Sequence, residues 1–207
     1  MSRLMSTLGW DLRIQFRQGF YYAALFVIGL WVLVLTQLPA EFTALFLPYI
    51  IFFDLSVFGF YFMAGMLFLE KGEGVLEALV VTPLRKREYL VSKALTLSLL
   101  ALLVSAAVVL MVYGPGINWL LFVPGVMLNS WLLVLFGFIL ASRYDAVNEF
   151  LIPSIIYVIP SQLPAFWYFG IWDHWLLYLI PTMPSMLLIA GAFTPIAPWQ
   201  VVYSLLY

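Results

Sequence analysis

Cysteine is absent from this chain of 207 residues, and charge is scarce, since only 9% of the residues are charged. The lack of cysteine excludes disulfides, thiol catalysis and thiolate metal sites. A soluble domain of this size needs a polar surface, which 9 basic and 10 acidic side chains cannot supply. The net charge of −1 gives no sign of a nucleic-acid partner. Because 65% of the residues are hydrophobic, we expect the excess apolar surface to face the lipid bilayer.

Long apolar runs predict an all-α polytopic membrane protein that forms one domain over residues 1–207. A helix needs about 20 apolar residues to cross a hydrocarbon core of about 30 Å. Four runs meet this length, and a fifth carries three prolines, which spanning helices tolerate with a kink. The Pro-rich segment Ile171–Ala197 predicts short external helices. Trp199–Tyr207 predicts either a sixth span that is cut off, which we favour, or an interfacial stub. The five predicted spans are Phe20–Leu38, Phe42–Leu69, Tyr89–Tyr113, Trp119–Ala141 and Phe150–Gly170.

The distribution of basic residues predicts the orientation in the membrane. When the five spans alternate, all nine Lys and Arg residues fall on one side. By the positive-inside bias this side is cytoplasmic, which places the N-terminus inside the cell and the chain in the cell membrane. Tryptophan and tyrosine residues concentrate on the other side, as expected for an interfacial aromatic belt.

The first 18 residues predict an amphipathic helix on the cytoplasmic face of the bilayer. Leu4, Leu8, Leu12 and Phe16 recur every four residues, while charged and polar residues occupy the other faces. Such a helix can lie in the headgroup plane with its apolar stripe toward lipid. The alternative is a soluble flank.

The longest polar region, Glu70–Glu88, joins the second and third predicted spans. Its acidic residues share one helical face and its Leu and Val residues another. Thr82 followed by Pro83 is a helix-start signal. A connector needs only a few residues, so we expect a docking helix on the cytoplasmic surface; the alternative is a solvated loop.

This region resembles the signature between the second and third spans of ABC transporter type-2 permeases, the membrane subunits of drug, lipid and polysaccharide exporters. The residues that carry the resemblance are Glu70, Lys71, Gly74, Leu76, Glu77, Leu79, Thr82, Pro83, Leu84, Tyr89, Leu90 and Lys93. It implies a coupling helix at about residues 72–81 that docks on a separate ATP-binding subunit, and a second permease copy, identical or not. The implied coupling residues are Glu73, Gly74, Leu76, Glu77, Leu79, Thr82, Pro83, Arg85 and Arg87.

The chain has no nucleotide site of its own, because no Walker A sequence occurs. We therefore expect no enzymatic activity and no cofactor in this chain, with ATP and Mg²⁺ bound by the partner. A single histidine, His174, is a poor basis for a metal site, and we expect it to form interfacial hydrogen bonds.

Asp54 is the one acidic residue deep in a predicted span, where a charge is costly. It either contacts substrate or a gate, or is a hydrogen-bonded packing residue. The neighbouring Phe53 and Phe58 are candidates for an apolar substrate surface.

The function expected from these features is export of a hydrophobic or amphipathic small molecule, a drug or a lipid. The aromatic second span favours a resemblance to the fluoroquinolone-export type. The alternatives are a permease similar to the haem exporter of cytochrome c maturation, and a small channel or scaffold. An intramembrane enzyme is disfavoured, since no nucleophile with a base, paired acids or metal cluster can be assembled.

Overall fold

The computed structural model describes residues 3–75 and 85–206, except for the side chains of residues 3, 4, 54–56 and 86. Within these ranges the chain is helical and contains no strand, as predicted. The elements are α1 (Arg3–Arg17), α2 (Phe20–Thr36), α3 (Ala40–Ile50), the π-helix η1 (Ile51–Leu55), α4 (Ser56–Gly72), α6 (Lys86–Val112), α7 (Trp119–Ala141), α8 (Val147–Ser161), α9 (Pro164–Tyr168), the 3-10 helix η2 (Trp175–Leu179), α10 (Met183–Phe193) and α11 (Pro198–Leu206).

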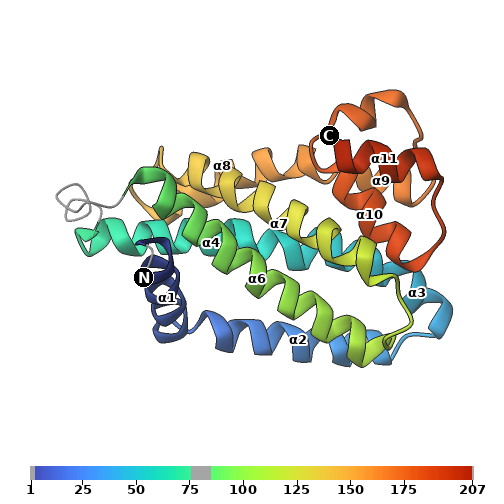
Figure 1. The fold of residues 1–207 in the computed structure, drawn as a ribbon, viewed down its shortest axis with the longest axis horizontal. Helices are drawn as coiled ribbons and strands as arrows, with labels where there is room; N and C mark the ends of the chain where they lie inside the picture. The colour runs from blue at the N-terminus through green and yellow to red at the C-terminus, as the bar shows by residue number, and fades with distance from the viewer. Residues whose placement is uncertain (1–2, 76–84, 207) are drawn as a thin grey trace.

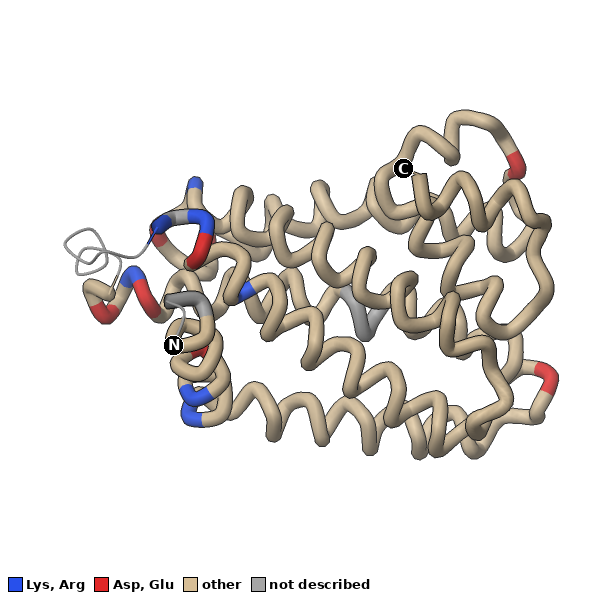
Figure 2. Tube along the Cα trace, in the orientation of Figure 1, with Lys and Arg blue, Asp and Glu red and all other residues tan. Residues whose placement is uncertain are grey.

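The long helices run side by side along the long axis of the molecule, and the short ones gather at its two ends (Figure 1). Helix α1 crosses the bundle at one end, whereas α9, α10 and α11 cluster at the other. Figure 2 shows that the Lys and Arg residues of the described ranges lie at or near the end that carries α1, and that the charged residues at the far end are acidic. The predicted separation of basic charge along the bundle is therefore present in the fold.

In the described part of the chain, three helices are long and apolar enough to cross a membrane: Ala40–Gly72, Arg87–Val112 and Trp119–Ala141. A fourth span results if the bent pair α1–α2 is counted as one. The first four predicted spans thus coincide with helices. In the region of the fifth, α8 ends at Ser161 and the chain turns into α9, which begins at Pro164. Pro164 has no backbone N–H, so it cannot donate the hydrogen bond that would continue α8. It lies instead in the first turn of α9, where the backbone N–H groups have no partner within the helix.

The bend between α1 and α2 lies at Gly19. The two helices meet at 64°, and Gly19 has a φ of +82°. Glycine adopts this left-handed conformation without the steric cost of a Cβ atom. The bend directs α1 across the bundle end while α2 continues along the bundle.

The second span contains a π-helix in its middle, where α3 passes into α4. Pro48 lies three residues before η1 and cannot donate a backbone hydrogen bond. The wider π-turn alters the backbone hydrogen-bonding ladder, and the side chain of Asn129 on α7 donates to the carbonyl oxygen of Phe52 at 3.0 Å. A buried amide thus bonds to the irregular turn inside the bundle.

Helices α4 and α7 pack closely because glycines remove side chains from their contact. A Cβ atom at Gly137 would lie 2.6 Å from the carbonyl oxygen of Phe60, and one at Gly59 would lie 2.9 Å from Val134. Small residues at such contacts let spanning helices approach each other. The core on either side of this contact is formed by buried phenylalanine, leucine and methionine side chains.

We expect Gly137→Ala to destabilise the protein by about 1–3 kcal/mol, the cost of forcing a methyl group into a filled contact. The clash is with backbone, so a change of rotamer cannot relieve it. The matched control is Gly65→Ala on α4, where a Cβ atom meets nothing within 4 Å. Thermal unfolding in detergent should show a lower midpoint for Gly137→Ala alone, and equal midpoints for the two variants would contradict this packing.

Helix α10 dips into the bundle from the far end, in agreement with the predicted short helices of the Pro-rich segment. Its residues Met183–Ala192 are all buried. A Cβ atom at Gly125 on α7 would lie 2.9 Å from Leu188, so the glycine makes room for α10. The backbone N–H of Asn118 donates to the carbonyl of Ala192 at 2.9 Å and fixes the end of α10 to the start of α7.

Candidate coupling site and membrane groove

The predicted coupling segment lies partly outside the described residues, which exclude Leu76, Glu77, Leu79, Thr82 and Pro83. Its two flanks are described. On the first flank α4 ends at Gly72, Glu73 is exposed, and Gly74 has a φ of +69°. On the second, Arg85 and Arg87 are exposed at the start of α6. The described rim charges are thus accessible at the basic end of the bundle, as their predicted role requires.

A buried ion cluster joins the two flanks of this segment. The ammonium of Lys93 on α6 lies 2.6 Å from Oε1 of Glu70 on α4 and 3.2 Å from Oδ1 of Asp11 on α1. The Lys93 side chain is fully buried, and both carboxylates are nearly so. Buried charges are tolerated only when they are paired and hydrogen-bonded. One cation therefore holds three helices together.

Neighbouring polar side chains satisfy the remaining oxygens of the two carboxylates. The hydroxyl of Ser92 donates to Oδ2 of Asp11 at 2.5 Å, and the hydroxyl of Tyr89 donates to Oε2 of Glu70. The Lys93 ammonium also lies 4.8 Å from the centroid of the Tyr89 ring, within the range of a cation–π interaction. Each carboxylate thus has a positive partner and a hydroxyl donor.

A second contact fixes α1 to α6 one turn away. Gln15 is fully buried, and its Nε2 donates to Oγ1 of Thr96 at 2.8 Å. Thr96 in turn donates to the carbonyl oxygen of Lys93 at 3.2 Å. Because Asp11 and Gln15 are four residues apart, they share one face of α1. That face points into the bundle, whereas Leu12 and Phe16 are exposed, as predicted for a lipid-facing stripe.

Sequence reasoning found only part of this cluster. Glu70, Tyr89 and Lys93 belong to the resemblance motif, but their mutual contact was not predicted. Asp11 was predicted only to lie off the apolar stripe of α1, and its burial in the bundle, at 3% exposure, was not predicted. The available signal was the pair Asp11 and Gln15, two polar residues at a spacing of four that share one helical face.

Lys71 fixes the same end of α4 to the C-terminal end of α7. Its ammonium donates to the carbonyl of Tyr144 at 2.5 Å and to those of Ala141 and Ser142 at 3.4 Å. The last carbonyls of a helix have no partner within the helix and carry partial negative charge. The cation therefore caps α7 and positions α4 beside it, next to the ion cluster.

A groove of about 510 Å³ lies between the second span and helices α8 and α9. Phe53 lines it, as do Tyr61 on α4 and Gln162 just after α8. The prediction that Phe53 belongs to an apolar surface is consistent with this position, since its side chain is 40% exposed. The volume lies within the range of small-molecule sites, roughly 300–1,000 Å³.

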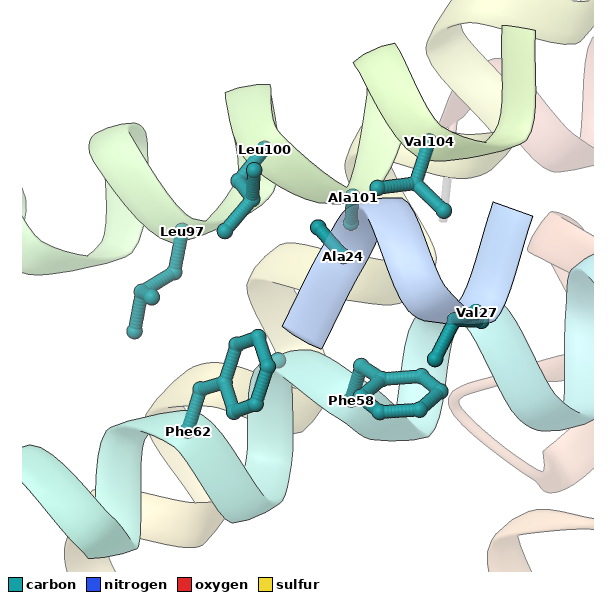
Figure 3. A pocket seen from close by; sticks show the side chains of 9 residues that line it. Ala24, Val27, Phe58, Phe62, Leu97, Leu100, Ala101 and Val104 are labelled. Carbon is teal, nitrogen blue, oxygen red and sulfur yellow. The ribbon is translucent and has the colours of Figure 1, made fainter. Parts of the chain in front are cut away.

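The structure does not bring Phe58 to the same groove. Phe58 points with Phe62 into a space between α2, α4 and α6 (Figure 3). Its volume of about 10 Å³ holds about one water molecule, which is too small for a drug-sized molecule. Asp54 belongs to η1 by its backbone, and its side chain lies outside the described part of the chain, so its two interpretations both stay predictions.

His174 has the hydrogen-bonding role that the sequence predicts. Its Nδ1 accepts from the backbone N–H of Leu176 at 3.3 Å and caps η2. Its ring stacks with Trp172 at a centroid distance of 5.7 Å. Within the described ranges, no group of three or more His, Cys, Asp or Glu residues could hold a metal ion.

Comparison with known proteins gives one consistent result. A family model described as "Fluoroquinolones export permease protein family" matches residues 2–207. The chain is 36% identical over 210 residues to the fluoroquinolones export permease proteins of two Mycobacterium tuberculosis strains, CDC 1551 / Oshkosh and ATCC 25618 / H37Rv. Each alignment covers 100% of this chain and 89% of the relative. No solved structure matches the chain.

Proposed function

Because this chain belongs to the fluoroquinolones export permease protein family, we propose that it is the membrane subunit of an ATP-driven exporter of hydrophobic or amphipathic small molecules. The family match bears out the resemblance to drug-export permeases that the cytoplasmic motif indicated. It also favours a drug exporter over a haem-exporter-like permease, a channel or a scaffold.

The ion cluster is the observation that carries the proposal. Glu70 precedes the segment of residues 76–84, and Lys93 follows it, and these two side chains form an ion pair. A subunit that pulls or pushes this segment would move the ends of α4 and α6 together. Asp11 adds α1 to the same rigid unit. A docking event on the cytoplasmic side would thereby be transmitted to three helices at once.

The partners follow from this role. A separate ATP-binding subunit supplies ATP and Mg²⁺, since this chain has no Walker A sequence. It docks on the coupling segment, with the exposed Arg85 and Arg87 at the rim of the contact. A second permease copy, identical or not, completes the translocation path.

The orientation proposed is the one that the basic residues favour. The end of the bundle that carries α1 and the Lys and Arg residues faces the cytoplasm (Figure 2). The chain then lies in the cell membrane with its N-terminus inside. In this topology α8 and α9 form the fifth span and α11 belongs to a sixth.

Co-purification with an ATP-binding subunit tests the proposed function. We expect the full chain, expressed with an ATP-binding subunit taken from a neighbouring gene, to retain that subunit on an affinity column. The purified pair should hydrolyse ATP faster when a fluoroquinolone is added, whereas the permease alone should hydrolyse none. The control is the pair in which the Walker A lysine of the partner is replaced. Failure to co-purify, or hydrolysis by the permease alone, would contradict the proposal.

A further inference from the structure

The contacts on the bundle-facing side of α1 fix the rotation of this helix about its axis. Asp11 pairs with Lys93 at 3.2 Å, and Gln15 donates to Thr96 at 2.8 Å. These two side chains hold one face of α1 against α6. The side chains on the other faces of the helix therefore point away from α6, in directions that the helical repeat determines.

Arg13 and Arg17 lie on this outward side, one turn apart. Both are exposed, and four residues place them about 6 Å apart along the helix axis. Among the described residues, neither arginine forms an ion pair. Asp11 is the one acidic residue of α1, and it is buried and paired with Lys93. In the described part of the chain, the two outward charges thus have no anionic partner.

Exposed apolar side chains border the two arginines on both sides. Leu12 and Phe16 each precede an arginine by one residue and form a parallel row, and Trp10 lies on the other side, three residues before Arg13. All three apolar side chains are exposed. A basic row beside an apolar row matches the boundary of a bilayer, where charged headgroups meet acyl chains and where tryptophan is enriched.

The bend at Gly19 places this surface at the level of the headgroups. Helix α2 continues along the bundle, and α1 is turned from it by 64°. In a bundle that spans the membrane, α1 therefore lies nearer the membrane plane than the membrane normal, across the end where the basic residues gather (Figures 1 and 2). Water alone would leave the apolar row unsatisfied, and a zwitterionic bilayer would offer the arginines no net negative charge.

We propose that α1 binds the headgroups of anionic phospholipids. The guanidinium groups of Arg13 and Arg17 donate hydrogen bonds to the phosphate oxygens, while Leu12, Phe16 and Trp10 insert among the first acyl carbons. This binding does not depend on the exporter role. The orientation proposed above assigns it to the cytoplasmic leaflet.

The absence of cysteine lets a single reporter be placed beside the site. Ser6 is exposed on α1, so Ser6→Cys can carry a bimane label that brominated lipids quench on contact. The full chain is placed in nanodiscs of phosphatidylcholine and phosphatidylglycerol, with bromine on one lipid or the other and without an ATP-binding subunit. We expect phosphatidylglycerol to associate with the labelled helix about tenfold more strongly than phosphatidylcholine, because two arginines face it.

Substitutions in the Ser6→Cys background show whether the arginines cause this preference. Arg13→Gln with Arg17→Gln should reduce it to near equality, and either change alone should reduce it about threefold. Arg13→Lys with Arg17→Lys keeps both charges and should retain most of the preference. Arg143→Gln removes an exposed cation just after α7 and should leave it unchanged. High salt should weaken it in the labelled parent.

Two results would overturn the proposal. One is equal quenching by the two brominated lipids in the labelled parent, and the other is an undiminished preference in the glutamine variants. The thermal unfolding midpoint identifies the variants that are folded, and the single substitutions decide the question if the double variant is not. Because no partner subunit is present, a negative result here leaves the co-purification test of the exporter role intact.

Discussion

Lys93→Met should unfold the protein at a markedly lower temperature than wild type. The substitution leaves the carboxylates of Asp11 and Glu70 buried within reach of each other without a counter-charge. Removing one partner of a buried ion pair lowers the free energy of unfolding by about 3–5 kcal/mol, because the other charge stays buried without a partner. Replacing the whole pair by apolar residues costs far less. The measurement is the thermal unfolding midpoint of the full chain in detergent, together with the yield of folded protein.

A compensated variant separates loss of charge balance from loss of packing. Asp11→Asn and Glu70→Gln, combined with Lys93→Met, remove all three charges, and most of the lost stability should return. The comparison variant is Lys71→Met, which removes a partly exposed cation bound to carbonyls and should cost less than Lys93→Met. A Lys93→Met protein as stable as wild type would show that the cluster does not hold the three helices.

The second large effect concerns the coupling segment. Leu76→Asp with Leu79→Asp should abolish co-purification with the ATP-binding subunit, because two charges would replace the apolar residues predicted to enter its groove. These positions lie outside the described residues, so the prediction rests on the sequence motif. Pull-down of the tagged permease, followed by quantification of the retained subunit, measures the effect.

The conservative control for this experiment is Leu76→Met with Leu79→Met, which keeps both side chains apolar and should retain the partner. We expect the unfolding midpoint of the permease to be the same in both variants, so that a loss of the partner reports on docking and not on folding. If the double aspartate variant retains as much ATP-binding subunit as wild type, this segment is not the coupling helix, even though the chain belongs to the permease family.

The membrane helices could be predicted because their signal is local. The run Trp119–Ala141 was predicted with the bounds that α7 has, since length and apolarity alone define a span. The end of α8 was harder to predict, because Pro153 lies inside the helix whereas Pro164 starts the next one. The sequence does not distinguish a proline that the helix accommodates from one at which it ends.

The contacts between distant segments could not be predicted in the same way. Lys93 and Asp11 are 82 residues apart, and no periodicity links them. Gln15 and Thr96, which form a buried hydrogen bond, are likewise 81 residues apart. The composition predicted that apolar surface faces lipid, but the contacts between buried polar side chains could be found only in the structure.

The position of Lys93 also constrains the order in which the chain can assemble as it is made. Asp11 leaves the ribosome 82 residues before its cation does, an interval of roughly 4–16 s at ordinary synthesis rates. During that time Asp11 lacks the ammonium group with which it pairs in the folded bundle, and we expect water to solvate its carboxylate. Insertion of α6 brings Lys93 and Ser92 together to meet it. The N-terminal helix, although synthesised first, is thus docked only after the third long helix has arrived.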